Sequence, residues 1–250
     1  MFGTTPKMPV YRHFDLQAIE ASLRRMQASF DAINPSLQVR RDRLDDEVVA
    51  YMVEGYAYVD ALIRDGVNVF ALGSLKCLLD INRLVLCGSS DRRRKRYASH
   101  LQATEQHFYE EREGGVGDLV EWVQDHARDT VWERAAGVYV RILSKPQLYL
   151  EGNHRSGALV VSYVLGKEGL PPFVLSPENA KTYFDPSSLI TNTGKKSLWM
   201  VFRMPGVKKR FAAFLKNQSN PEFLSPDTAL ESPLVPQASE AAGTFFRRLT

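Results

Sequence analysis

Residues 147–157 read Gln-Leu-Tyr-Leu-Glu-Gly-Asn-His-Arg-Ser-Gly, and a mostly apolar run, residues 158–165, follows them directly. The run is long enough for a helix and apolar nearly all round, which predicts a helix that is buried on every side. Residues 153–157 then lie at its start. The first amide groups of a helix lack partners within the helix, and the helix dipole adds about half a positive charge there. The stretch therefore predicts a seat for an anion such as phosphate.

The side chains of this stretch suit such a ligand. Gly152 lets the backbone turn sharply or approach a ligand closely, and Arg155 can hold a phosphate with two parallel hydrogen bonds. Glu151 offers a hard oxygen ligand of the kind that Mg²⁺ accepts. The alternative is a polar loop before a core helix, which is a common structural feature and needs no ligand.

At these residues a family resemblance emerges. The stretch resembles the signature of the Fic (Fido-fold) family, HxFx(D/E)GNGRxxR. The matching positions are Tyr149 for the aromatic residue, Glu151 for the acidic residue, Gly152 and Asn153 for the Gly-Asn pair, and Arg155 for the first arginine. Three positions depart from the signature. Gln147 occupies the place of the catalytic histidine, His154 that of the second glycine, and Ala158 that of the second arginine.

The resemblance implies a ligand set and a fold. Fic proteins bind nucleotide phosphates at the helix start, hold a metal with the acidic residue, and transfer AMP to a protein hydroxyl within an all-helical core. Here the resemblance implies that ATP and Mg²⁺ are bound, with Glu151 as the metal ligand. The residues it assigns to the nucleotide are Gly152, Asn153, Arg155, Ser156 and Gly157.

The catalytic base is the weak point of the match. An amide such as that of Gln147 offers only hydrogen bonds and takes up no proton at neutral pH, and loss of a general base costs about 10²- to 10⁴-fold in rate. His154 is a candidate substitute base, because a helix N-terminus keeps an imidazole neutral. The alternative for His154 is a loop histidine bonded to the backbone.

A second motif lies about a hundred residues upstream. Some Fic proteins carry an inhibitory motif, (S/T)xxxE(G/N), and residues 50–55 match it except that Ala50 replaces the hydroxyl residue. The resemblance implies that Glu54 points into the nucleotide site and restrains the γ-phosphate. The alternative is a glutamate on the surface of a helix. Because Ala158 removes the usual arginine partner, Glu54 would pair with Arg155 or stay solvated.

Composition and periodicity predict an all-α fold with at most a small β-hairpin. The chain has 250 residues, of which 44% are hydrophobic and 24% charged, as in ordinary globular proteins. We expect an N-terminal arm over residues 1–14, one helical domain over residues 15–216 and a weakly ordered tail over residues 217–250. The Fic resemblance is strongest over residues 45–170. The first helix is expected to begin after Asp15 as its cap.

Other segments have less specific patterns. The apolar residues 67–87 predict one core helix or two joined ones, and residues 114–117 predict a flexible loop. The basic run at residues 92–96 predicts a solvated loop, with an acidic protein partner as the alternative. His100 and His107 are seven apart and can share one helical face, yet no third metal ligand accompanies them at helical spacing.

The remaining observations bound the location and partners. A formal net charge of +3 is too small to predict nucleic-acid binding, and no apolar stretch reaches the length of a membrane span. Two cysteines give no disulfide framework, so we expect a cytoplasmic protein. Two functions remain: a Fic-like enzyme that transfers AMP or another phosphate-linked group to a protein, or removes it, and an inactive Fic pseudoenzyme that contacts a protein partner.

Overall fold

The computed structural model describes residues 12–110, 114–197, 200 and 202–226. Over this part of the chain it confirms an all-α fold: only two isolated β-bridges occur there, and neither a strand nor a hairpin. The helices are α1 (Leu16–Ile33), α2 (Asp46–Arg64), α3 (Lys76–Cys87), α4 (Asp91–Arg96), α5 (Ala98–Glu110), α6 (Val116–Asp125), α7 (Val131–Leu143), α8 (Asn153–Gly166), α9 (Ala180–Thr191) and α11 (Met204–Asn217). None of them is long and apolar enough to cross a membrane.

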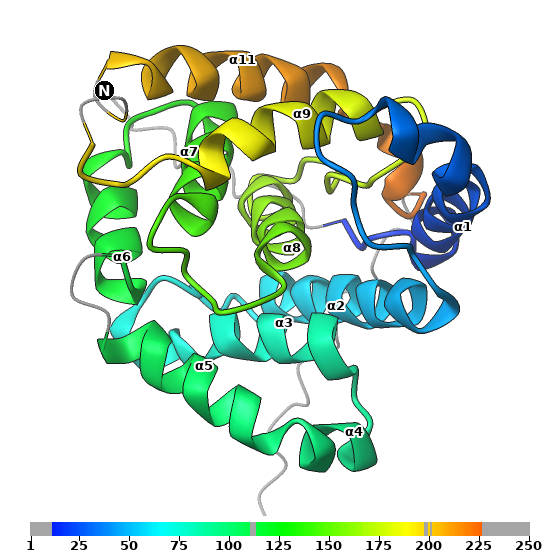
Figure 1. Ribbon diagram of the computed structural model, residues 1–250, viewed down its shortest axis with the longest axis horizontal. Coiled ribbons are helices and arrows are strands. Elements are labelled where there is room, and N and C mark those ends of the chain that lie inside the picture. The colour runs from blue at the N-terminus through cyan, green and yellow to red at the C-terminus, as the bar shows by residue number, and fades with distance from the viewer. Residues whose placement is uncertain (1–11, 111–113, 198–199, 201, 227–250) are drawn as a thin grey trace, which may run out of the picture.

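Helix α8, which carries the signature, lies in the middle of the molecule. Figure 1 shows α2 and α3 below it, α7 beside it, and α9 and α11 above it. All of its residues except His154 and Arg155 are buried. The apolar sequence of this helix therefore meets neighbours on every side, as predicted, and only its first turn approaches the surface.

Two glycines allow the neighbouring helices to approach α8 closely. A Cβ atom on Gly55 of α2 would lie 2.4 Å from a methyl group of Leu159, and one on Gly157 would lie 2.9 Å from the ring of Tyr139 on α7. Both distances are shorter than van der Waals contact allows. The packing of α2 and α7 against α8 therefore depends on the absence of side chains at these positions.

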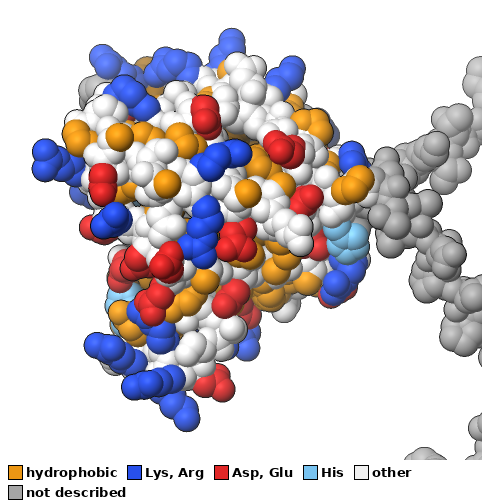
Figure 2. Space-filling view, turned by 90° about the vertical axis from the view of Figure 1, so that its right-hand side faces the viewer, with side chains coloured by type: hydrophobic (Ala, Val, Ile, Leu, Met, Phe, Trp, Pro, Cys, Tyr) orange, Lys and Arg blue, Asp and Glu red, His pale blue; other side chains and the backbone are white. Residues whose placement is uncertain are grey.

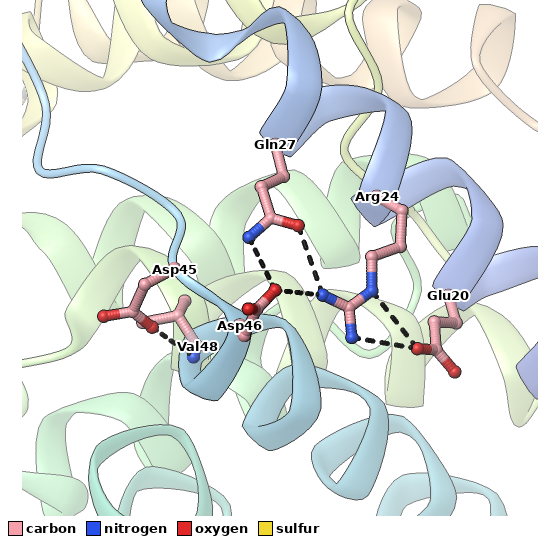
Figure 3. Close-up of polar contacts among 6 residues, drawn as sticks. All are labelled: Glu20, Arg24, Gln27, Asp45, Asp46 and Val48. Atoms are coloured by element: carbon pink, nitrogen blue, oxygen red, sulfur yellow. Dashed lines mark hydrogen bonds and ion pairs between the residues drawn. The ribbon is translucent and has the colours of Figure 1, made fainter.

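Polar contacts fix the starts of α1 and α2. Asp15 caps α1, as predicted, by accepting from two backbone amides, and Asp45 caps α2 by accepting from the amide of Val48 at 2.8 Å. Figure 3 shows that Asp46 then joins the two helices, because it accepts from Arg24 at 2.5 Å and from Gln27 at 3.1 Å. The segment between α1 and α2 is thus held at its α2 end.

The structure corrects three segment predictions. The basic run is not a loop but helix α4, which Ser90 caps. In Figure 2, Lys and Arg side chains gather at the bottom of the molecule, where Figure 1 places α4. Residues 67–75 form turns and the short 3₁₀ helix Leu72–Ser74 instead of a core helix. Helix α6 begins at Val116, inside the segment predicted to be a loop. Helix α4 was missed because it lacks the regular spacing of apolar residues from which the other helices were predicted.

Both ends of the described chain pack on the core. Phe14, from the predicted arm, is buried and forms an antiparallel bridge with Leu224, from the predicted tail. The backbone amide of Asp15 also donates to the carbonyl of Phe223 at 2.9 Å. The core therefore extends beyond the predicted bounds of the helical domain at both ends: it includes Phe14 before α1, and Phe223 and Leu224 after α11. Most of the predicted arm and tail, residues 1–11 and 227–250, lies outside the described residues.

Candidate functional site

The loop before α8 is closed by the side chain of Asn153. Its Oδ1 accepts from the amide of Tyr149 at 3.0 Å, and its Nδ2 donates to the carbonyl of Tyr149 at 2.7 Å. Tyr149 itself is buried, and its hydroxyl donates to the carbonyl of Leu78 at 2.9 Å. These contacts anchor the loop to α3 and fix the direction in which α8 begins.

Gly152 makes the turn from this loop into the helix. Its φ angle of 76° lies in the left-handed region that glycine adopts without strain. A Cβ atom there would also lie 3.1 Å from Nδ2 of Asn82 on α3. That Nδ2 donates to the carbonyl of Glu151 at 2.9 Å and to the hydroxyl of Ser156 at 3.0 Å. The start of α8 is thus pressed against α3, as a glycine-hinged loop allows.

The first turn of α8 presents unpaired amide donors. The amides of Asn153, His154 and Arg155 have no acceptor among the described residues, and Gly152 provides no side-chain cap. A cavity of about 240 Å³ lies beside this turn, lined by residues 151–155 of the loop and helix and by the segment before α2. A second, apolar cavity of about 70 Å³ shares the lining residues His154 and Arg155. The helix start therefore faces an open space, as an anion seat requires.

Arg155 lines both cavities. One of its Nη atoms donates to the carbonyl of Val85, and no carboxylate within the described ranges forms an ion pair with it. Burial lowers the pKa of Arg155, while the carboxylates of Glu151, Asp42 and Asp45 act in the opposite direction from a distance. A guanidinium that is largely buried and forms no ion pair favours an anion nearby.

Glu151 lies at the rim of the larger cavity. Its side chain is 59% exposed, and its carboxylate is 3.6 Å from Nε2 of His100 on α5. In the part of the chain that the structure describes, no group of three potential metal ligands occurs. Glu151 is thus an accessible carboxylate beside the helix start, and the exposed Asp42 lines the same cavity.

Gln147 is engaged in hydrogen bonds within the loop. Its Nε2 donates to the carbonyl of Leu143 at 3.3 Å, and its Oε1 accepts from Nδ2 of Asn153 at 3.3 Å. Its backbone carbonyl lies 2.7 Å from Nε2 of His107, which must donate this bond. Ser156 and Gly157, the other residues assigned to a nucleotide, are buried and are not among the residues that line the cavity.

His154 faces away from the loop. Its Nδ1 lies 3.1 Å from the hydroxyl of Tyr139, and its Nε2 lies 3.2 Å from an Nη atom of Arg41. Because arginine only donates, Nε2 accepts and Nδ1 carries the proton. Burial and the charge of Arg41 lower the pKa of His154 to about 4. The ring is therefore neutral near pH 7, but its accepting nitrogen is occupied.

Glu54 lies on α2, and its side chain contacts the turn between α3 and α4. Its carboxylate accepts from the amide of Ser89 at 2.6 Å, and within the described residues it forms no ion pair with Arg155. The inhibitory role that the resemblance implies for Glu54 stays a prediction.

Three residues of this region were not assigned to the site from the sequence. Arg41 lies in no periodic segment, and nothing in its neighbours along the chain indicates its position. His100 and His107 did carry a signal, because a spacing of seven places both on one face of α5, and in the structure that face turns toward Glu151 and Gln147. The sequence lacked only the information that α5 packs beside the signature loop.

Comparisons with known proteins add no relative. No protein-family model, no curated protein and no solved structure matches this chain. The resemblance to the Fic family consequently rests on the residues of the signature and of the upstream Glu54 motif alone.

Proposed function

We propose that this chain binds a nucleotide whose phosphates lie at the start of α8. One observation carries the proposal: within the described residues the amides of Asn153, His154 and Arg155 have no acceptor and the guanidinium of Arg155 forms no ion pair, and these groups belong to residues that line the same 240 Å³ cavity. Amide donors, the positive end of a helix and an arginine are the groups that phosphate binds. The Fic resemblance favours ATP over other phosphate-bearing ligands.

Glu151 is the residue that would hold Mg²⁺ together with this nucleotide. Mg²⁺ is commonly bound by one or two carboxylates, by substrate phosphates and by several waters, so an exposed carboxylate at the rim fits it. The ion would offset the negative charge of the phosphates. The residues of the chain would bind and orient the ligand.

Binding without transfer is the function that the geometry favours. The amide of Gln147 takes the place of the family's base and is tied to Leu143 and Asn153, and the accepting nitrogen of His154 is occupied by Arg41. Neither residue is placed to take a proton from an incoming hydroxyl. We therefore propose a Fic-like nucleotide-binding protein that acts through contacts with a protein partner.

Transfer of AMP is a second candidate, and the position of His107 favours it. Its Nε2 donates to the carbonyl of Gln147 at 2.7 Å, so in the neutral ring Nδ1 keeps a lone pair. This bond fixes the imidazole against the backbone of Gln147, the residue at the position of the family's base. An oriented neutral histidine is the usual general base in proteins.

Thermal unfolding with ATP and Mg²⁺ tests nucleotide binding. We expect the melting temperature of the wild type to rise with ATP concentration, because a ligand that binds only the folded state stabilises it. Arg155→Ala should abolish this rise, while Arg96→Ala, which removes an exposed charge on α4, should keep it. A wild type that shows no rise at millimolar ATP contradicts the proposal.

Incubation with labelled ATP and cell lysate separates the two candidates. A binding protein leaves no label on itself or on other proteins, and Gln147→His should then create labelling. If the wild type transfers label and His107→Ala abolishes the transfer while His126→Ala does not, the second candidate is correct and the chain is an enzyme.

A further inference from the structure

Arg41 is built into the cavity beside α8 from a distant part of the chain. It lies between the 3₁₀ helix Asn34–Ser36 and α2. Asn34 fixes its backbone at both polar groups: Oδ1 accepts from the amide of Arg41 at 2.8 Å, and Nδ2 donates to its carbonyl at 3.0 Å. The backbone position of Arg41 is therefore fixed by Asn34, the residue that follows α1.

The side chain of Arg41 is held in one orientation by neutral groups. One Nη atom donates to Nε2 of His154 at 3.2 Å, and the other donates to the hydroxyls of Ser187 and Ser188 at 3.2 and 3.0 Å. The guanidinium also lies over the ring of Phe184, 5.2 Å from its centroid. Helices α8 and α9 thus fix the cation at the wall of the cavity that contains the start of α8.

Arg41 forms no ion pair within the described residues, and its Nε is buried without an acceptor. Its charge acts on Asp185 only at longer range, as one of the causes that lower the pKa of that carboxyl. Asp185, on the same helix as the two serines, is paired with Lys181 at 2.9 Å and accepts from the amide of Gln38. A partly buried cation that forms no ion pair costs free energy, and the positive end of α8 adds to the cost.

We propose that Arg41 is the second cationic ligand of the site and that it selects a ligand with two linked phosphates over one with a single phosphate. This inference rests on the proposed nucleotide site. Arg41 and Arg155 both line this cavity, and one guanidinium together with the helix end suffices to hold a single phosphate. A diphosphate group offers one more anionic phosphate, which can reach the second guanidinium.

Binding of inorganic phosphate and pyrophosphate at constant ionic strength tests the proposal. Titration calorimetry on the full chain should show that the wild type binds pyrophosphate at least about tenfold more tightly than phosphate, as expected for one more charge-assisted contact. Arg41→Gln should remove this preference while phosphate binding remains. Arg40→Gln is the matched control. It removes the same charge from the neighbouring position, but Arg40 is exposed and is not among the residues that line the cavity, so the preference should persist.

The outcomes separate this inference from the proposed function. If the wild type binds neither anion, nucleotide binding at α8 is wrong and the role of Arg41 falls with it. If the wild type binds both anions and Arg41→Gln retains the preference, only the role of Arg41 is wrong, and its contacts with α9 are structural. Arg41→Lys guards against misfolding, because it keeps the charge. Arg41→Lys should retain part of the preference for pyrophosphate. If this variant folds but loses both the preference and phosphate binding, the result counts against the proposal.

Discussion

At the scale of single residues, His154 links the candidate site to the stability of the fold. The pKa of its ring is lowered to about 4 by burial and by Arg41, against an ordinary value of 6.5. Between these values the unfolded chain binds a proton that the folded chain does not bind. The stability contributed by neutral His154 is therefore fully present above pH 6.5 and is lost as the pH falls toward 4.

We expect this loss to reach about 3 kcal/mol, because each unit of pKa difference corresponds to about 1.4 kcal/mol. Urea unfolding at pH 7.5 and pH 4.5 measures it. In His154→Gln, whose amide oxygen can still accept from Arg41, the decrease in stability between the two pH values should be smaller than in the wild type by about 2 kcal/mol. Equal decreases in the two proteins would show that the folded structure does not lower the pKa of His154, so that its ring is protonated at pH 4.5.

Whether a residue of the site could be assigned from the sequence depends on how far along the chain its partners lie. Gly152, Asn153 and Arg155 could be assigned from the sequence, because a helix start is a local feature and all three lie within one turn of it. Arg41 could not be assigned, because the residue that orients it, His154, is 113 positions away. Only tertiary structure brings the two together.

At the scale of elements, the start of α8 depends on the left-handed turn at Gly152. We expect Gly152→Ala to lower the free energy of unfolding by about 1–2 kcal/mol, because an alanine at positive φ is strained. Its Cβ would also press on Asn82, Val85 and Leu86 of α3. Urea unfolding measures the change.

Gly73→Ala is the matched control for this substitution. A Cβ atom at Gly73 would meet nothing within 4 Å, and the backbone there is not left-handed. Its stability should stay within about 0.5 kcal/mol of the wild type. Equal effects at the two positions would mean that the turn before α8 does not need glycine.

The helices themselves could be predicted where one face is apolar and a cap is present, as in α1 after Asp15. Helix α4 could not, because its six residues include no apolar position. It is instead stabilised by the cap Ser90 and by Arg93, which contacts Glu47 and lies over the ring of Tyr51 on α2. Conversely, the apolar residues 67–75 turn instead of forming a helix, and the hydroxyl of Tyr163 on α8 donates to the carbonyl of Val67 at 2.7 Å. Distant partners decided both outcomes.

At the scale of the whole molecule, the two ends of the described chain close over the far end of α8. A Cβ atom on Gly166, the last residue of α8, would lie 2.9 Å from the ring of Phe14, and Phe14 pairs with Leu224 through the backbone. The sequence placed both segments outside the domain, because a single buried residue in a non-periodic stretch gives no pattern. Their burial means that residues before α1 and after α11 contribute to the stability of the core.

Phe14→Ala tests this contribution. Phe14 is only 4% exposed, so we expect the variant to lose about 3–4 kcal/mol through lost burial and the cavity left against α8. Phe202→Ala is the control, because Phe202 is 76% exposed, and its effect should be below about 0.5 kcal/mol. Urea unfolding followed by circular dichroism measures both. If the two variants unfold at the same urea concentration, the first segment is not part of the core, and the helical domain begins at α1 as periodicity predicted.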